Sequence, residues 1–101
     1  MRVEENITFE EVQKVSETVI GRLNELTGRS FKPHSKGTVN LLKAALKKGY
    51  SETHLLSIVE HKVFQWINVN TMNIYLRPRT LFSISNLYNY NIAAKAFVIQ
   101  S

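Results

Sequence analysis

The chain has 101 residues, of which 44% are hydrophobic and 21% are charged, and its formal net charge is +5. This length and composition predict one globular domain with a modest core, and they exclude a disordered chain. The chain has no cysteine, which excludes disulfides and cysteine metal ligands, and no apolar run approaches the ~20 residues of a membrane helix. Its acidic N-terminus lacks an apolar signal core, so we expect no export signal.

Acidic and basic residues are separated along the chain. Six of the eight glutamates lie in the first quarter, and aspartate is absent. No acid occurs from Leu26 to Ser51, and none follows Glu60. An acidic start followed by a basic body indicates an acidic partner, either a nucleic acid or an acidic protein surface.

The first predicted helix follows Thr8, which forms a capping-box pattern with Glu11. Apolar residues then recur at spacings of three and four, which is typical of one buried helix face: Phe9, Val12, Val15, Val19, Leu23 and Leu26. Gly28 is predicted to end this helix in a left-handed conformation.

The connector of residues 29–35 contains a proline, and we expect Phe31 to pack back onto the core. A second helix is predicted from Lys36 to Lys48, with Ser35 as its N-cap and Gly49 as its stop. Its lysines fit a solvated face, since cations near a helix C-terminus complement the macrodipole. A binding patch is the alternative.

Ser51 is predicted to cap a third helix that extends to about Asn68, with Trp66 as a core anchor rather than a stacking platform. A polar connector leads to a fourth helix over residues 78–90. The tail either continues this helix or forms a short strand or hydrophobic arm at Phe97–Ile99, and an exposed apolar tail would favour association.

These elements predict an all-α fold, a small single-domain bundle of about four helices. We expect one domain over residues 1–101. It divides into an N-terminal arm (1–7), a helical core (8–90) and a tail (91–101).

Catalytic and metal-binding patterns are scarce. His54 and His61 lie on one helix face, but they are ~10 Å apart along the axis, too far to share an ion. The glycines are isolated, so no phosphate-binding loop is present, and neither G-x-S-x-G nor HExxH occurs. We therefore expect no enzyme activity, no cofactor and no metal.

The stretch Tyr75–Phe82 combines aromatic, aliphatic and guanidinium groups around Pro78. Proline fixes its own φ, disfavours a helical Arg77 and suits the first turn of a helix. We interpret Leu76, Leu81 and Phe82 as core residues. Arg77 and Arg79 are either contacts for a partner or solvent-exposed residues with a local helix-terminus bond.

Several blocks of the sequence resemble the conserved phage C-terminal domain of phage replication-initiation proteins. They are Leu23–Gly28, Phe31-Lys32, Ser35–Thr38, Leu46–Ser51, Lys62 with Trp66, and Met72–Phe82. The resemblance covers Val19 to Tyr90. In that family the domain usually follows a DNA-binding winged-helix region, which we expect to be missing here. A freestanding copy is similar to a small staphylococcal phage inhibitor of the DnaI-type helicase loader, a AAA+ ATPase.

The resemblance implies a phage protein that binds the host helicase loader in the host cytoplasm and blocks initiation of host DNA replication. Arg, Tyr and Trp often dominate interface energies. We expect partner contacts at Tyr75, Arg77, Arg79, Tyr88 and Tyr90, with Lys62 as an addition. A DNA-binding accessory protein of phage replication is the alternative, and a homodimer is the third hypothesis.

Overall fold

The computed structural model describes residues 7–100, with side chains through Phe97. Over this range the chain forms five α-helices, one 3-10 turn and no strand, which confirms the all-α prediction. The helices are α1 (Phe9–Thr27), α2 (Lys36–Lys47), α3 (Glu52–Trp66), α4 (Pro78–Leu81) and α5 (Ile84–Gln100), and the 3-10 turn is η2 (Asn73–Tyr75). Most of the predicted N-terminal arm, residues 1–6, lies outside this range.

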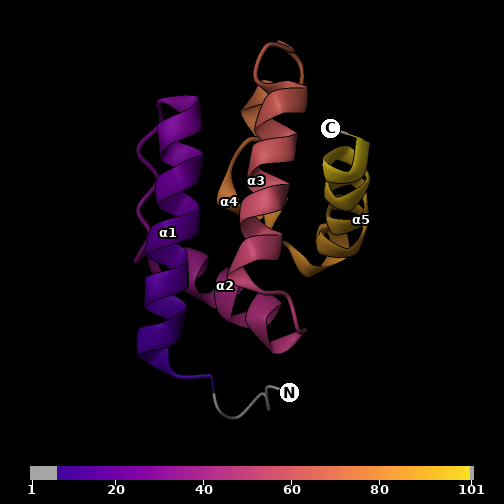
Figure 1. Ribbon diagram of the computed structural model, residues 1–101. Coiled ribbons are helices and arrows are strands. Elements are labelled where there is room, and N and C mark those ends of the chain that lie inside the picture. Colours follow the sequence, from indigo (N-terminus) through magenta and orange to yellow (C-terminus); the bar gives the residue numbers. More distant parts are fainter. Residues whose placement is uncertain (1–6, 101) are drawn as a thin grey trace.

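Helix α3 is the central element of the fold. It packs against α1 on one side and α5 on the other, while α2 crosses below and contacts both α1 and α5 (Figure 1). An ion pair joins α1 to α3, with Arg22 Nε 3.0 Å from Glu60 Oε2. The fully buried side chains come from every α-helix, and the largest are Phe82, Ile20, Leu23, Leu42, Leu55, Ile58, Leu76, Leu81 and Leu87.

The predicted helix starts are confirmed by their capping bonds, whereas α2 and α3 end slightly earlier than predicted, at Lys47 and Trp66. Each N-cap hydroxyl accepts a hydrogen bond from the backbone N–H three residues later, at 3.1 Å for Thr8, 3.4 Å for Ser35 and 3.2 Å for Ser51. The ring Nδ1 of His54 accepts the Ser51 N–H at 2.9 Å, which completes a capping box at α3. Gly28 ends α1 with φ 72°, in the left-handed region.

Two expectations from the sequence need correction, one about a buried residue and one about the extent of a helix. Phe9 is 67% exposed, although its spacing placed it on the buried stripe of α1. It stands in the first turn, and burial along α1 begins one turn later at Val12. The single helix predicted over residues 78–90 is also wrong, because α4 ends at Leu81 and α5 starts at Ile84.

The tail continues α5 through Gln100, so the helical alternative is the observed one. The Phe97 ring lies 5.1 Å from that of Phe64 and 4.9 Å from that of His61, both on α3. These ring contacts attach the end of α5 to the domain. The side chains of Val98 and Ile99 lie outside the described residues.

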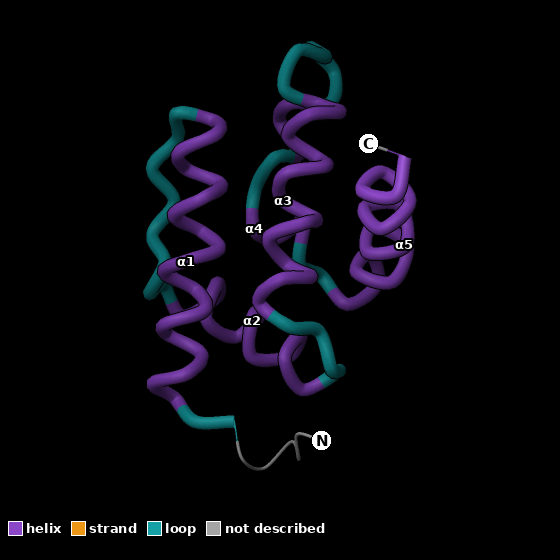
Figure 2. The backbone as a smooth tube through the Cα atoms, in the orientation of Figure 1, coloured by secondary structure: helices purple, strands orange, loops and turns teal. Residues whose placement is uncertain are grey.

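The connector between α1 and α2 runs back along α1 (Figure 2). The side chain of Asn24 holds it with two hydrogen bonds to Phe31, accepting the backbone N–H at 2.8 Å and donating to the carbonyl at 2.9 Å. The hydroxyl of Ser16 donates to the carbonyl of Pro33. Phe31 packs against the core as predicted, and these hydrogen bonds hold the connector beside α1.

Replacing Asn24 with alanine should destabilise the protein by about 1–3 kcal/mol, because the partly buried N–H and C=O of Phe31 both lose their partner. Chemical denaturation of N24A against the wild type measures this change. Asn40→Ala, an exposed position of α2, is the control and should leave stability nearly unchanged. Equal stabilities of N24A and N40A would contradict the assigned role.

Candidate functional site: a cationic groove between α2 and α4

The stretch around Pro78 alternates between buried and exposed side chains. Leu76, Leu81 and Phe82 are fully buried, which confirms their predicted core role. Arg77 is extended, with φ −149° and ψ 153°, as expected before a proline, and Pro78 opens α4. The chain thereby anchors its leucines and phenylalanine inside while Arg77 and Arg79 remain exposed.

Arg77 is held in place by its neighbours. Its Nε donates a hydrogen bond to Thr80 Oγ1 at 3.2 Å, and its guanidinium carbon lies 5.8 Å from the centre of the Tyr75 ring. Tyr75 itself is 38% exposed. The expected local bond at the helix terminus and the expected exposure are therefore both present, and they leave part of the guanidinium free for further hydrogen bonds.

Arg77 and Arg79 line a groove of about 520 Å³ between α4 and the start of α2. Its other lining residues come from the connector and the first turns of α2: Phe31, Lys32, Ser35, Gly37, Thr38, Leu41, with Pro78 from α4. The lining therefore contains three cationic side chains and no acidic one. Two sequence blocks more than 35 residues apart meet here, Phe31–Leu41 and Arg77–Arg79.

One long-range hydrogen bond joins residues that lie just before these two blocks. Arg29 Nη1 donates to the carbonyl of Leu76 at 2.8 Å, across 47 residues of sequence. Sequence reasoning missed this role for Arg29 and missed Asn24 as well, although both stand in or beside the block that carries the family resemblance. Nothing in a local pattern identifies a side chain whose partner is a distant backbone carbonyl.

Lys62, Trp66 and Tyr90 form a separate cluster between α3 and α5. The Lys62 ammonium lies 4.9 Å from the centre of the Trp66 ring and 4.6 Å from that of Tyr90, and it donates to Gln65 Oε1 at 2.8 Å. Only 6% of Lys62 is exposed. Burial lowers the pKa of Lys62 and raises that of Tyr90. Trp66 packs against the core, in agreement with its predicted role as an anchor.

The structure thus places five of the six predicted contact residues in two groups, with Tyr88 apart from both. Tyr75, Arg77 and Arg79 lie together at or beside the groove, whereas Lys62 and Tyr90 pack against each other. Tyr88 is 67% exposed on α5. Partner binding by all six residues stays a prediction, and for Lys62 the buried cluster points first to a structural role.

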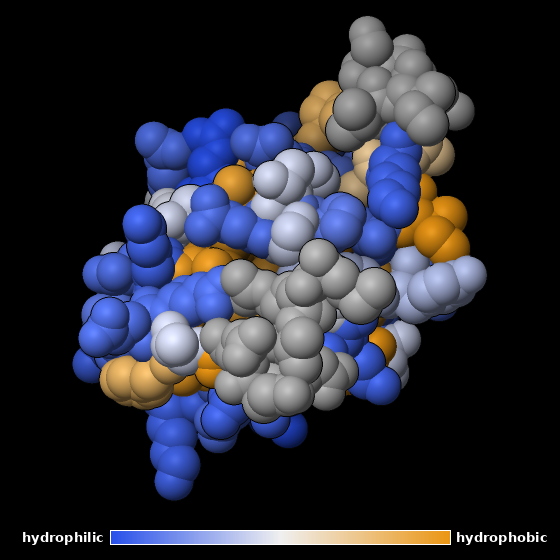
Figure 3. All heavy atoms as spheres, turned by 60° about the horizontal axis from the view of Figure 1, so that its bottom comes forward, coloured by the Kyte–Doolittle hydropathy of each residue, from blue (hydrophilic) through white to orange (hydrophobic). Residues whose placement is uncertain are grey.

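An apolar stripe runs along the exposed side of α5. Ile84, Tyr88 and Ile92, spaced four residues apart, are 43%, 67% and 49% exposed. Apolar side chains are visible at the α5 edge of the domain, on the right of Figure 3. Self-association through such a stripe stays a prediction.

The described residues contain no group of three His, Cys, Asp or Glu side chains placed to hold a metal ion. His54 is engaged in the α3 capping box, and His61 lies against Phe97. In the described part of the chain, no helix is long and apolar enough to cross a membrane.

Comparison with known families places this all-α domain among phage proteins. The family model described as the conserved phage C-terminus matches residues 19–91, which is most of the chain. The chain belongs to this family, as its sequence blocks predicted. No curated protein and no solved structure is significantly similar to it.

Acidification should destabilise the fold through His61. Burial, and to a smaller degree the charge of Lys62, lowers the pKa of His61 below its ordinary value of 6.5. The unfolded chain therefore protonates His61 at a higher pH than the folded protein does. The free energy of unfolding is at its full value above the unfolded pKa, and it decreases as the pH falls from the unfolded pKa toward the lower folded pKa. Thermal denaturation between pH 7.5 and pH 5 measures this loss. The variant His61→Phe should lose less stability than the wild type over that range, and an identical loss would refute the assignment.

Proposed function

We propose that this phage protein is a binding module of DNA replication that docks on the host helicase loader, a AAA+ ATPase, and blocks host initiation. The observation that carries the proposal is the cationic groove. It brings together Phe31-Lys32 and Arg77–Arg79, which stand in two of the sequence blocks that carry the family resemblance. Lys32, Arg77 and Arg79 are all exposed, so their charges are accessible to a partner.

The mechanism needs affinity and no catalytic residue. A module bound to the loader surface that phage initiators use would keep the loader from its own partners, and helicase loading would stall. The arginines suit such a contact because a guanidinium forms paired hydrogen bonds with a carboxylate and retains its charge at every physiological pH.

Isothermal titration calorimetry with the purified host loader, with and without nucleotide, tests the proposal directly. We expect saturable binding at a defined stoichiometry. Absence of both measurable heat and co-elution in size-exclusion chromatography would overturn the loader as the partner.

The double variant Arg77→Glu/Arg79→Glu should weaken loader binding by at least about tenfold, because it replaces attraction with like-charge repulsion at the contact. Circular dichroism should show an unchanged helical content. The control, Lys43→Glu/Lys95→Glu, makes the same change in net charge at two exposed positions that do not line the groove, and it should bind as the wild type does. An equal loss in both double variants would show that only the overall charge matters.

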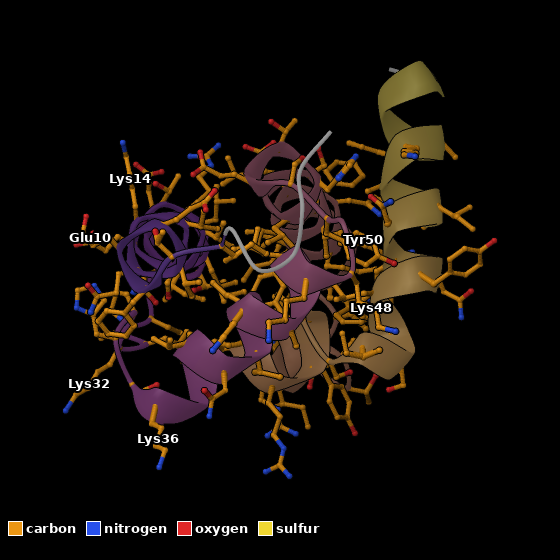
Figure 4. All side chains as sticks on the ribbon, turned by 90° about the horizontal axis from the view of Figure 1, so that it is seen from below. Glu10, Lys14, Lys32, Lys36, Lys48 and Tyr50 are labelled. Atoms are coloured by element: carbon orange, nitrogen blue, oxygen red, sulfur yellow. The ribbon has the colours of Figure 1, made fainter. Side chains whose placement is uncertain are left out.

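DNA binding is the second candidate function, because the same exposed cations could neutralise phosphates. Lys32 in the connector and Lys36 in the first turn of α2 both point outward (Figure 4). This candidate predicts a mobility shift of DNA that weakens steeply with salt. A protein that shifts no DNA at low salt does not have this function.

A further inference from the structure

The groove between α2 and α4 has the chemistry of a peptide-binding site in which every charged lining residue is positive. We propose that it binds an acidic segment of a partner protein, with carboxylates against Arg77, Arg79 and Lys32 and one apolar side chain between Phe31 and Leu41. This inference rests on the proposed function and specifies the chemistry of the partner.

The floor of the groove is already formed in the free protein. Phe31 and Leu41 are partly buried and pack against the core, and Pro78 is buried. The Asn24 hydrogen bonds fix the backbone of Phe31, and the Arg29 bond to Leu76 fixes the other wall. A ligand therefore meets an apolar surface that needs little ordering, which favours affinity.

The cations of the rim lack acidic competitors among the lining residues. The chain has no acid from Leu26 to Ser51 and none after Glu60, so neither wall can supply its own carboxylate. Three like charges around one groove raise the local potential and attract an anionic ligand. The bond of Arg77 to Thr80 and its contact with Tyr75 orient that guanidinium in advance.

A second hollow, between α1 and α2, differs in this respect. It has a volume of about 860 Å³ and lies where the start of α1 faces the end of α2. Its lining mixes glutamates with lysines, and Lys14, Lys48 and Tyr50 can be followed there in Figure 4. That lining has no single sign of charge, whereas every charged residue that lines the α2–α4 groove is a cation.

The size and the floor favour a peptide over a nucleic acid. A volume near 520 Å³ accommodates a few side chains, and the floor consists of Phe31, Leu41 and Pro78. Single-stranded nucleic acids bind along longer cationic tracks with aromatic faces open for stacking. Here Phe31 is half-buried, and Tyr75 lies against the guanidinium of Arg77.

Two glycines offer a matched pair of variants for the test. Gly37 lines the groove in the first turn of α2, and Gly21 lies on the exposed side of α1. A Cβ added at either position meets no other atom within 4 Å, so a side chain fits at both. Gly37→Glu places a carboxylate where the proposed ligand would bind, and Gly21→Glu makes the same change elsewhere.

The probe is a short fluorescent peptide with glutamates on both sides of a leucine, and binding is followed by fluorescence anisotropy. We expect saturable binding that weakens with salt. Binding should weaken at least about tenfold in G37E and in Arg79→Glu, and remain unchanged in G21E. Peptides with glutamine for glutamate, or with alanine for leucine, should bind more weakly.

Three results would overturn the inference: no peptide binding, equal weakening in G37E and G21E, or displacement of the peptide by a single-stranded oligonucleotide that binds more tightly. The last result would assign the groove to nucleic acid.

Loader binding in the same variants separates the two proposals. A loader that binds G37E as tightly as the wild type leaves the proposed function standing and refutes the groove as its contact. Peptide binding without loader binding refutes the loader instead.

Discussion

The hydrogen bond from Arg29 to the carbonyl of Leu76 is the long-range polar contact that supports the groove between α2 and α4. It ties the connector after α1 to the segment before α4, and the groove lies between residues from these same two regions. The Leu76 side chain is fully buried, so the bond is anchored in the core at one end. Direct packing of α2 against α4 also joins the two walls.

The split of the predicted last helix follows from the same core. Leu81, Phe82 and Leu87 are all fully buried. In one continuous helix, Leu81 and Phe82 would point about 100° apart and Leu87 in a third direction. Breaking the helix at Ser83 lets α4 and α5 each turn its own apolar residues inward. The carbonyl of Ser83 then accepts the Leu87 N–H at 3.0 Å and starts α5.

Polar side chains of this domain have two roles: some hold structural elements together, and others expose their charge at the surface. Asn24 and Arg29 donate hydrogen bonds to the backbone carbonyls of Phe31 and Leu76, and the ammonium of Lys62 lies over the ring of Tyr90. Lys32, Arg77 and Arg79 have their charge at the surface of the groove. This division explains why the short stretch Tyr75–Phe82 holds both fully buried and exposed side chains.

The sequence by itself determined the helix starts at Thr8, Ser35 and Ser51, the left-handed stop at Gly28 and the core role of Leu76, Leu81 and Phe82. These features depend on contacts within a few residues or on burial periodicity. Only the tertiary structure decided that Phe9 is exposed, that Lys62 is buried beside Tyr90, and that Phe31 and Arg79 line one groove. Those outcomes depend on which distant segments meet, and a one-dimensional pattern carries no record of side-chain bonds such as the one from Arg29 to Leu76.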